Sequence, residues 1–341
     1  MGRFIIATLS PAVLLIGGAL WGGIWILAAV GAITLLTFAM DRLGRAAQVH
    51  QPEAEFPSGD ALSVGLALLH MPMLVLACWS IGGESLHTLP ERIGLVIGYG
   101  LFFGQVAHPN AHELIHRSPR ALRALGQMIY ITLLIGHHVS AHRLVHHIHV
   151  ATDADPSSAL ANESFWRFAP RGWLGAFRAG LHAESARRHK AGKKGLNPYV
   201  LYCGGATVTM LVALDLWGVT GLVALVALAS YAQMQMLLSD YVQHFGLRRK
   251  ILASGKAEPV GPQHSWNTPH WYSSAMMLNA PRHSDHHLNP MRPYPGLRLE
   301  QTMPILPHSL PVMAVIALWP KLWRRVMHPR LAALSPAGSG Q

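Results

Sequence analysis

Long apolar runs constrain this chain more than any other feature of its sequence. The stretch 4–40 contains no charged residue and is long enough for two spans, because a bilayer core of about 30 Å needs roughly 20 residues per helix. Gly-Gly pairs at 17–18 and 22–23 mark the expected reversal within it. We predict six membrane-spanning helices, paired as three hairpins, over about 4–19, 22–40, 61–81, 92–111, 199–217 and 219–239, with Gly218 as the last break.

Composition supports a membrane protein and excludes other classes. Of the 341 residues, 51% are hydrophobic and 13% are charged, whereas a soluble protein carries about 25% charged residues. The N-terminal apolar stretch is too long for the apolar core of a signal peptide, so we do not expect it to be cleaved. Cys78 and Cys203 both lie inside apolar runs, which argues against a disulfide scaffold.

The distribution of basic residues predicts the orientation. The short turns near 20, 82–90 and 218 contain no Lys or Arg, and only Arg92 lies at that face. The positive-inside rule then places both termini and the large polar segments in the cytoplasm. The formal charge of +11 therefore reflects topology and anionic-lipid contact. We expect no nucleic-acid partner, because the Lys and Arg residues are scattered without a binding motif.

These patterns predict an all-α integral membrane fold with a cytoplasmic, histidine-rich cap. Segments 121–136 and 310–319 are too short to span and read as re-entrant or interfacial helices. The expected organisation is four transmembrane helices in 1–111, a cytoplasmic segment 112–198, a transmembrane hairpin 199–240, a second cytoplasmic segment 241–334 and a disordered tail 335–341.

Histidine is the second anomaly, with 22 residues against 16 acidic ones. Nine of them form four clusters at the predicted cytoplasmic edge. Residues four apart on a helix share a face and can share one metal ion. Nine imidazoles exceed one four-coordinate zinc and suit two ions with four or five nitrogens each, and imidazole alone does not choose among Zn, Cu, Fe and Ni. The predicted ligands are His112, His116, His142, His146, His147, His244, His283, His286 and His287.

Two other interpretations of these histidines are open. His112, Glu113 and His116 match the H-E-x-x-H motif, in which the glutamate is a protease base; such a site needs one further ligand, whereas seven more histidines are spaced as ligands here. A metal transporter places polar ligands near the bilayer midplane. The predicted spans are almost free of charge, and His70 is the one histidine remote from the clusters that lies inside a span.

The clusters and their flanking residues resemble the histidine boxes of the membrane alkane monooxygenases, within the wider membrane fatty-acid desaturase and hydroxylase superfamily. The similar segments are HELIHR at 112–117, HRLVHH at 142–147 followed by VATDADP at 150–156, QHFGL at 243–247, SWN at 265–267 and RHSDHH at 282–287 followed by Arg292 and Tyr294. The resemblance runs from about 92 to 297 with every box in order.

The resemblance implies two non-haem irons held by the nine histidines, with no further cofactor. It also implies electrons from a rubredoxin-type donor with its reductase, and transfer of one atom of O₂ to an unactivated C–H bond, typically a terminal methyl of an alkane. A bacterial inner membrane is the implied location. The chain departs from the family at Ala141, Gln243 and Arg117. None of these is a ligand, but they leave oxidation of alkyl-aromatic methyl groups, and acyl-lipid desaturation or hydroxylation, as alternatives.

Ligating imidazoles usually donate their second N–H to a carboxylate or carbonyl. Carboxylates in or beside the boxes that can do this are Glu113, Asp153, Asp155, Asp240 and Asp285. Other histidines near the boxes that helical spacing alone does not exclude as ligands are His108, His137, His138, His149, His264 and His270. Arg282 and Arg292 can bind an acidic donor protein or lipid phosphate. A substrate tunnel is expected between the spans, and residues such as Phe102, Phe103, Trp79 and Met73 are unassigned candidates for its lining.

Overall fold

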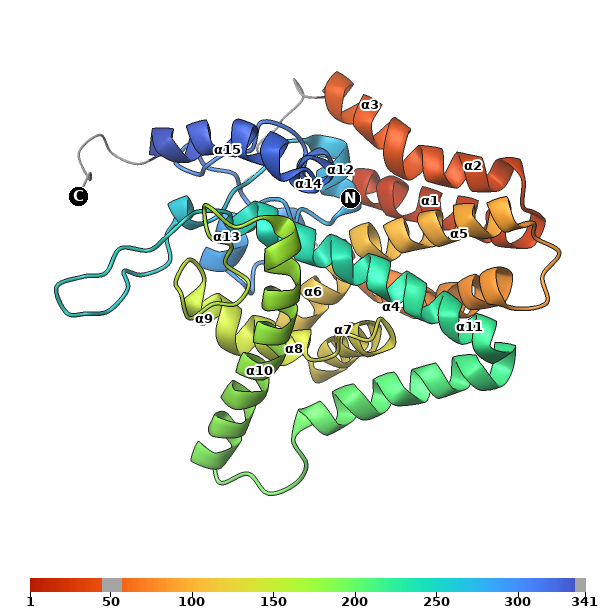
Figure 1. Cartoon of the computed structure of the whole chain (residues 1–341), viewed down its shortest axis with the longest axis horizontal. Helices are drawn as coiled ribbons and strands as arrows, with labels where there is room; N and C mark the ends of the chain where they lie inside the picture. Colours follow the sequence, from red (N-terminus) through yellow and green to blue (C-terminus); the bar gives the residue numbers. More distant parts are fainter. Residues whose placement is uncertain (45–56, 335–341) are drawn as a thin grey trace.

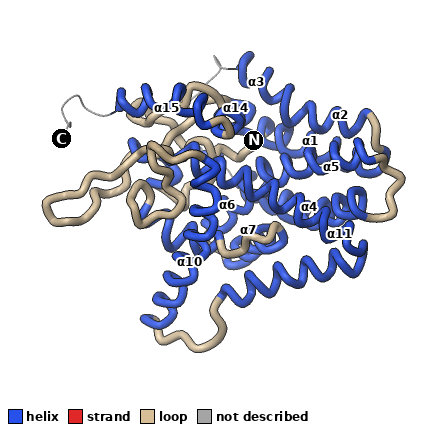
Figure 2. The backbone as a smooth tube through the Cα atoms, in the orientation of Figure 1, coloured by secondary structure: helices blue, strands red, loops and turns tan. Residues whose placement is uncertain are grey.

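A computed structural model describes residues 1–44 and 57–334. Within these ranges the chain is helical, with two isolated bridges and no strand (Figure 2). The prediction of an all-α chain is therefore confirmed for this part of the molecule. The predicted disordered tail, 335–341, lies outside the described residues, as does much of the 41–60 loop.

The N-terminal apolar stretch folds as a helical hairpin. α1 (Gly2–Trp21) is followed by α2 (Ile24–Gly31), which continues through η1 (Ala32–Leu36) into α3 (Thr37–Leu43). The reversal lies at Gly22 and Gly23, whose φ angles of 66° and 53° are in the left-handed region that favours glycine. The predicted position of this turn is confirmed.

The second hairpin joins α4 (Pro57–Gly82) to α5 (Leu89–Phe102). Thr88 and Glu91 form a capping box that begins α5, and the Glu91 carboxylate also accepts a hydrogen bond of 2.8 Å from the Gly23 backbone. α5 then continues through η3 (Phe103–Ala107) into α6 (His108–His116) without leaving helical geometry. One continuous helical run therefore carries the predicted 92–111 span into the first histidine cluster.

The third apolar region is α11 (Pro198–His244), a 47-residue element with non-helical backbone at Trp217 and Gly218. Gly218 has a φ of 62°, so the predicted break there is confirmed. The two halves diverge from this bend (Figure 1). The second half packs among the other apolar helices and ends in His244.

Four helices are long and apolar enough to cross a membrane: Gly2–Trp21, Ile24–Leu43, Gly59–Gly82 and Pro198–His244. Large apolar side chains such as Trp21, Leu27, Leu35, Val208 and Val219 are exposed on them. Extended exposed apolar faces mark a membrane or protein contact, and four such helices identify an integral membrane protein. The number of spans in the chain remains a prediction at six.

The remaining described helices are shorter or more polar than these four. α7 (Arg120–Thr132) packs beside α6, which carries His112 and His116. α10 (Phe165–Lys190) packs beside the segment 138–146. The C-terminal part contains α12 (Trp271–Met276), α14 (Leu310–Ala317) and α15 (Pro320–Leu334). The elements that carry histidine clusters are α6, α8 (His138–Ala141), η4 (His142–His146), α9 (His147–His149), the end of α11, and α13 (His283–Leu288). In Figure 1, α8, α9 and α13 lie at the opposite end of the bundle from the turns of the apolar hairpins.

Candidate metal centre

The nine predicted ligands come together in two groups. In each group, one ring nitrogen from every histidine lies within 4.8 Å of the others. The five-histidine group consists of His112, His116, His142, His147 and His286, and the four-histidine group consists of His146, His244, His283 and His287. Sequence spacing alone does not give this division, because all four clusters are separated along the chain by long segments.

The nitrogen spacing in the five-histidine group fits a shared cation. His142 Nε2 lies 2.8 Å from His112 Nε2 and 2.9 Å from His147 Nε2, which is 3.1 Å from His286 Nε2. A neutral imidazole nitrogen offers one proton or one lone pair, so this chain of four nitrogens cannot satisfy three ordinary hydrogen bonds. Two nitrogens bound to one ion at 2.0–2.1 Å are about 3 Å apart, which matches the observed spacing.

The four-histidine group has the same character. His283 Nε2 is 3.0 Å from His244 Nε2 and 3.2 Å from His287 Nε2. The Nε2 atom of His146 is buried without a hydrogen-bond partner among the described residues, as is that of His116 in the other group. A buried polar atom without a partner costs about 1–3 kcal/mol. Both groups therefore present nitrogen lone pairs that suit a metal ion.

A π-helical turn divides the cluster of His142, His146 and His147 between the two groups. His142 and His146 are four apart and would share a face of an α-helix, but they lie in the π-helix η4. Hydrogen bonding from i to i+5 widens this turn, so that His142 approaches His147 instead. His146 belongs to the four-histidine group. The expected pairing at i,i+4 is wrong here, whereas it holds for His112 with His116 and for His283 with His287.

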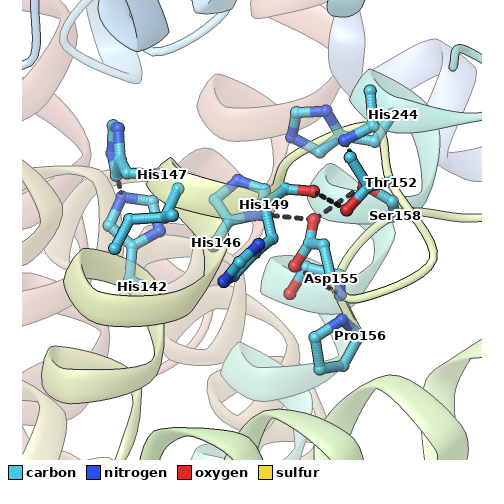
Figure 3. Close-up of polar contacts among 12 residues, drawn as sticks. His142, His146, His147, His149, Thr152, Asp155, Pro156, Ser158 and His244 are labelled. Carbon is cyan, nitrogen blue, oxygen red and sulfur yellow. Dashed lines mark hydrogen bonds and ion pairs between the residues drawn. The ribbon is translucent and has the colours of Figure 1, made fainter. Parts of the chain in front are cut away.

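Asp155 connects the V-A-T-x-x-D-P segment to the four-histidine group. Its Oδ2 lies 2.9 Å from His146 Nδ1 and accepts a hydrogen bond of 2.7 Å from the Ser158 hydroxyl. The Ser157 backbone N–H donates to its Oδ1. Figure 3 shows the carboxylate between His146 and Ser158. This contact orients the His146 ring so that Nε2 faces the other histidines, as outer hydrogen bonds do at metal sites.

Two other predicted carboxylates, Asp285 and Asp153, contact arginines and not histidine rings. Asp285 is buried, but its oxygens accept from Arg292, at 2.5 Å, and from the Arg298 backbone N–H. Asp153 is exposed over 94% of its side chain and lies 3.8 Å from Arg248. No hydrogen bond joins either carboxylate to a histidine ring in the described part of the chain.

Glu113 and Asp240 lie near the groups without contacting a ring. Glu113 is buried, with Arg117 at 3.7 Å; burial raises the pKa of Glu113 to about 7, although the Arg117 charge opposes the shift. Asp240 lines a cavity that reaches both histidine groups.

The two arginines predicted to bind a donor protein or lipid make contacts within the chain instead. Arg282 donates to the Leu297 carbonyl, and Arg292 donates to Asp285.

The histidines outside the family boxes are not in either group of the described residues. His137 packs edge-on against Trp173 and Phe177, and His264 is 3.1 Å from Glu258. His138 stacks on His142 with ring centroids 5.0 Å apart, and His108 packs against His138. These last two rings border the five-histidine group.

The electrostatic setting of the two groups differs. Burial and neighbouring imidazoles hold the pKa of His286 well below its ordinary value, which keeps the ring neutral and able to donate a lone pair to a metal. Burial also lowers the pKa of His146, but the Asp155 carboxylate outweighs this effect and raises it. One carboxylate therefore distinguishes the four-histidine group.

A cavity of about 370 Å³ reaches both groups. We call the part lined by His112, His142 and His283, together with Asp240 and Gln243, the inner end of the cavity. Apolar side chains line most of the rest, among them Ile33, Phe38, Leu101, Met234, Val315 and Leu318. The volume and apolar lining are typical of a small-molecule site.

The residues that line the cavity do not include the candidates Phe102, Phe103, Trp79 and Met73 that were considered from the sequence. Phe103 instead packs against His70 and Tyr99 in the helix bundle. Two polar residues that were not predicted as lining, Gln105 and Gln235, also line the cavity. The sequence could have indicated both residues, since each is a polar residue inside a segment predicted to span the membrane.

Known proteins with similar sequences share the region of this chain that contains the histidine groups. The sequence profile of the fatty acid desaturase family matches residues 87–316, which include all nine histidines. Alkane 1-monooxygenase 2 of Alcanivorax borkumensis is 31% identical over 72% of this chain and 65% of its own length. The chain therefore spans just under two thirds of that relative.

Two further relatives show the range of the similarity. Alkane 1-monooxygenase of Ectopseudomonas oleovorans is 29% identical over 96% of this chain and 84% of its own length. The hydroxylase component of the xylene/toluene monooxygenase of Pseudomonas putida is 26% identical over 67% of this chain and 62% of its own length. With the profile match covering more than half of its residues, the chain belongs to the fatty acid desaturase family.

Proposed function

We propose that this protein is a membrane non-haem di-iron monooxygenase that hydroxylates an unactivated C–H bond of an apolar molecule. The terminal methyl of a medium or long alkane, giving a primary alcohol, is the expected substrate. The observation that carries the proposal is the meeting of two all-imidazole groups at the inner end of an apolar cavity. The similarity to alkane 1-monooxygenases supports it.

The nine histidines of the two groups would hold the two irons. All the ligands are imidazoles, which iron accepts together with other first-row metals. When bound, the irons supply activation of O₂ with electrons from a donor. The chain's own contribution is positioning and exclusion of water: Asp155 fixes the His146 ring, and the buried groups are reached through the apolar cavity.

The cavity suits a substrate that arrives from the bilayer. Its outer part is formed by apolar side chains of η1, α3, α11 and α14, and each of these elements also carries exposed apolar residues. An alkane dissolved in the membrane can enter there without crossing water. The polar inner end, at His112, His142 and His283, is the expected position of the reacting C–H bond.

Topology and partners follow from the same proposal. Six spans place both termini and all histidine clusters in the cytoplasm of a bacterium, with the protein in its inner membrane. The helical run from α5 to α6 and the bend in α11 support six spans rather than four. A rubredoxin-type protein and its reductase would supply electrons from the cytoplasm.

The second candidate function is oxidation of an alkyl-aromatic methyl group. The similarity to a xylene/toluene monooxygenase component favours it, and the cavity lining is apolar enough for either substrate. Acyl-lipid desaturation is the alternative suggested by the family itself. Metal transport is not supported, because the histidine groups lie at the ends of the apolar helices rather than along a path between them.

Oxidation by cells that express this chain with a rubredoxin and its reductase tests the proposal. The panel contains n-alkanes, alkyl-benzenes and fatty acids, and products are identified by mass spectrometry. A primary alcohol from an alkane is the expected result. A desaturated acyl chain without alcohol would overturn it, and benzylic alcohols alone would favour the second candidate.

A further inference from the structure

The segment 265–267 resembles a family box but provides no ligand to either histidine group of the described residues. Its three residues are buried, with at most 2% of each exposed. Their hydrogen bonds lead to the two elements that bring His244 and His283 into the four-histidine group, the end of α11 and the start of α13. The segment therefore belongs to the site, although it does not hold the metal.

Trp266 holds the backbone on both sides of His244. Its backbone N–H donates to the Gln243 carbonyl at 2.8 Å, and its indole N–H donates to the Phe245 carbonyl at 2.9 Å. These two carbonyls belong to the residues that flank His244. A change in the direction of the His244 side chain would have to break one of the two bonds, so Trp266 fixes where this ring points.

Asn267 holds the first turn of α13. Its Oδ1 accepts from the Ser284 backbone N–H at 2.9 Å, and its Nδ2 donates to the Ser284 hydroxyl at 2.7 Å. A backbone N–H can only donate, which fixes the oxygen end of the amide. Because Ser284 directly follows His283, this two-point contact fixes the position of His283.

The segment is also bonded to 304–306, a part of the chain that carries no ligand. The Asn267 N–H donates to the Pro304 carbonyl, and the Leu306 N–H donates to the Asn267 carbonyl, both at 2.8 Å. These bonds form an isolated parallel bridge between Asn267 and Ile305. The segment is thus anchored independently of α11 and α13 and can serve as a fixed reference for both.

We infer that Trp266 and Asn267 are positioning residues that set the separation of His244 and His283, whose Nε2 atoms lie 3.0 Å apart. The two histidines lie on different helices, so the geometry of neither helix sets this distance. About 3 Å is the spacing that two nitrogens bound to one ion require. The inference rests on the proposed function only in treating the four-histidine group as a metal site.

Metal binding without turnover tests the inference. The purified full chain in detergent is freed of metal with a chelator and titrated with Co²⁺, which imidazole also binds, while the visible absorption is recorded. We expect two binding events in the unaltered protein. Trp266→Phe keeps an aromatic ring but removes the indole N–H, and it should weaken the event at the four-histidine group by about tenfold, as outer contacts of metal sites do.

The same titration of Asn267→Leu should differ in one respect. Its event at the four-histidine group should also weaken, and the event at the five-histidine group should weaken to a smaller extent, because α13 carries His286 as well. His244→Ala identifies the four-histidine event by its loss. Adding Trp266→Phe to His244→Ala should cause no further change in the remaining event, since the ring that Trp266 positions is already absent.

Two matched controls separate the hydrogen bonds from packing. Trp323 is 1% exposed, and its ring lies 5.1 Å from that of Phe245, but its indole N–H has no hydrogen-bond partner among the described residues. Thr268 follows Asn267, and its buried hydroxyl also lacks a partner in the described part of the chain. Trp323→Phe and Thr268→Val should keep both Co²⁺ affinities even if the melting temperature falls.

The outcomes distinguish this inference from the proposed function. Two Co²⁺ ions bound with unchanged affinities by Trp266→Phe and Asn267→Leu would overturn the inference and leave the proposed function intact. Equal weakening by Trp266→Phe and Trp323→Phe would also overturn it, because packing would then be responsible. If Asn267→Leu does not fold, Trp266→Phe decides. An unaltered protein that binds no Co²⁺ would overturn the proposed metal sites and the inference together.

Discussion

The five-histidine and four-histidine groups are built from the same boxes but in different surroundings. In the five-histidine group, His112 and His147 are partly exposed, and no carboxylate contacts a ring among the described residues. All four histidines of the other group are buried, and Asp155 holds His146 at 2.9 Å. The two groups are therefore not equivalent, although both consist of imidazole side chains. We expect the four-histidine site to be the more rigid one and the five-histidine site to exchange its ion more readily.

The largest expected effect follows removal of a ligand that joins α13 to the five-histidine group. His286→Ala takes away the imidazole 3.1 Å from His147 and should abolish substrate oxidation. Product formation in whole cells measures the effect. His182→Ala, on α10 outside both groups, is the control, and normal turnover by the His286 variant would refute its assignment as a ligand.

The second-largest effect is expected for a change at Asp155, which tests the difference between the two histidine groups. Asp155→Asn removes the charge that faces His146 and should weaken metal retention at the four-histidine group by about tenfold to a hundredfold, as outer-contact changes do at metal sites. Metal release to a chelator, followed over time, is the measurement. Metal release from the four-histidine group that is no faster than in the unaltered protein would contradict the proposed role of Asp155.

Asp285→Asn provides the contrast, because this carboxylate also lies among the ligands but contacts Arg292 and the Arg298 backbone. Its loss should lower the free energy of unfolding by roughly 2 kcal/mol, since a buried charged hydrogen bond is broken. Metal release should be faster than in the unaltered protein by much less than for Asp155→Asn. Chemical denaturation and the same chelator assay test both parts; equal metal loss in the two variants would remove the distinction.

The smallest effect is expected at Asp153, which was as good a candidate from the sequence as Asp155. Its side chain is 94% exposed, and exposed substitutions usually change stability by less than about 0.5 kcal/mol. Asp153→Asn should therefore leave metal content and the melting temperature unchanged. A clear loss of metal would show that Asp153 contacts the site.

Much of the fold was predictable because local rules decide it. Charge-free apolar stretches indicated the long helices, and glycines at 22–23 and 218 marked turns that need a positive φ. The nine clustered histidines could be identified for a similar reason, since helical spacing and flanking residues are local. Glu113 with His112 and His116 also lies on one helix, as expected.

The division of the histidines could not be predicted, because it depends on a π-helical turn and on packing between distant segments. His142 and His146 separate only because η4 widens the helix by one residue per turn, and sequence spacing does not reveal that. The contrast between Asp153 and Asp155 depends on the path of a loop. The hydrogen bond between Gln105 and Gln235 in the cavity wall joins residues 130 apart in the sequence.

The most direct measurement of the central claim is the metal content of the purified protein and of one variant from each group. We predict two irons per chain in the unaltered protein, and one in both His286→Ala and His244→Ala, because each removes a ligand from a different group. A single metal ion per chain in the unaltered protein, or full metal content in either variant, would contradict two separate histidine-bound sites.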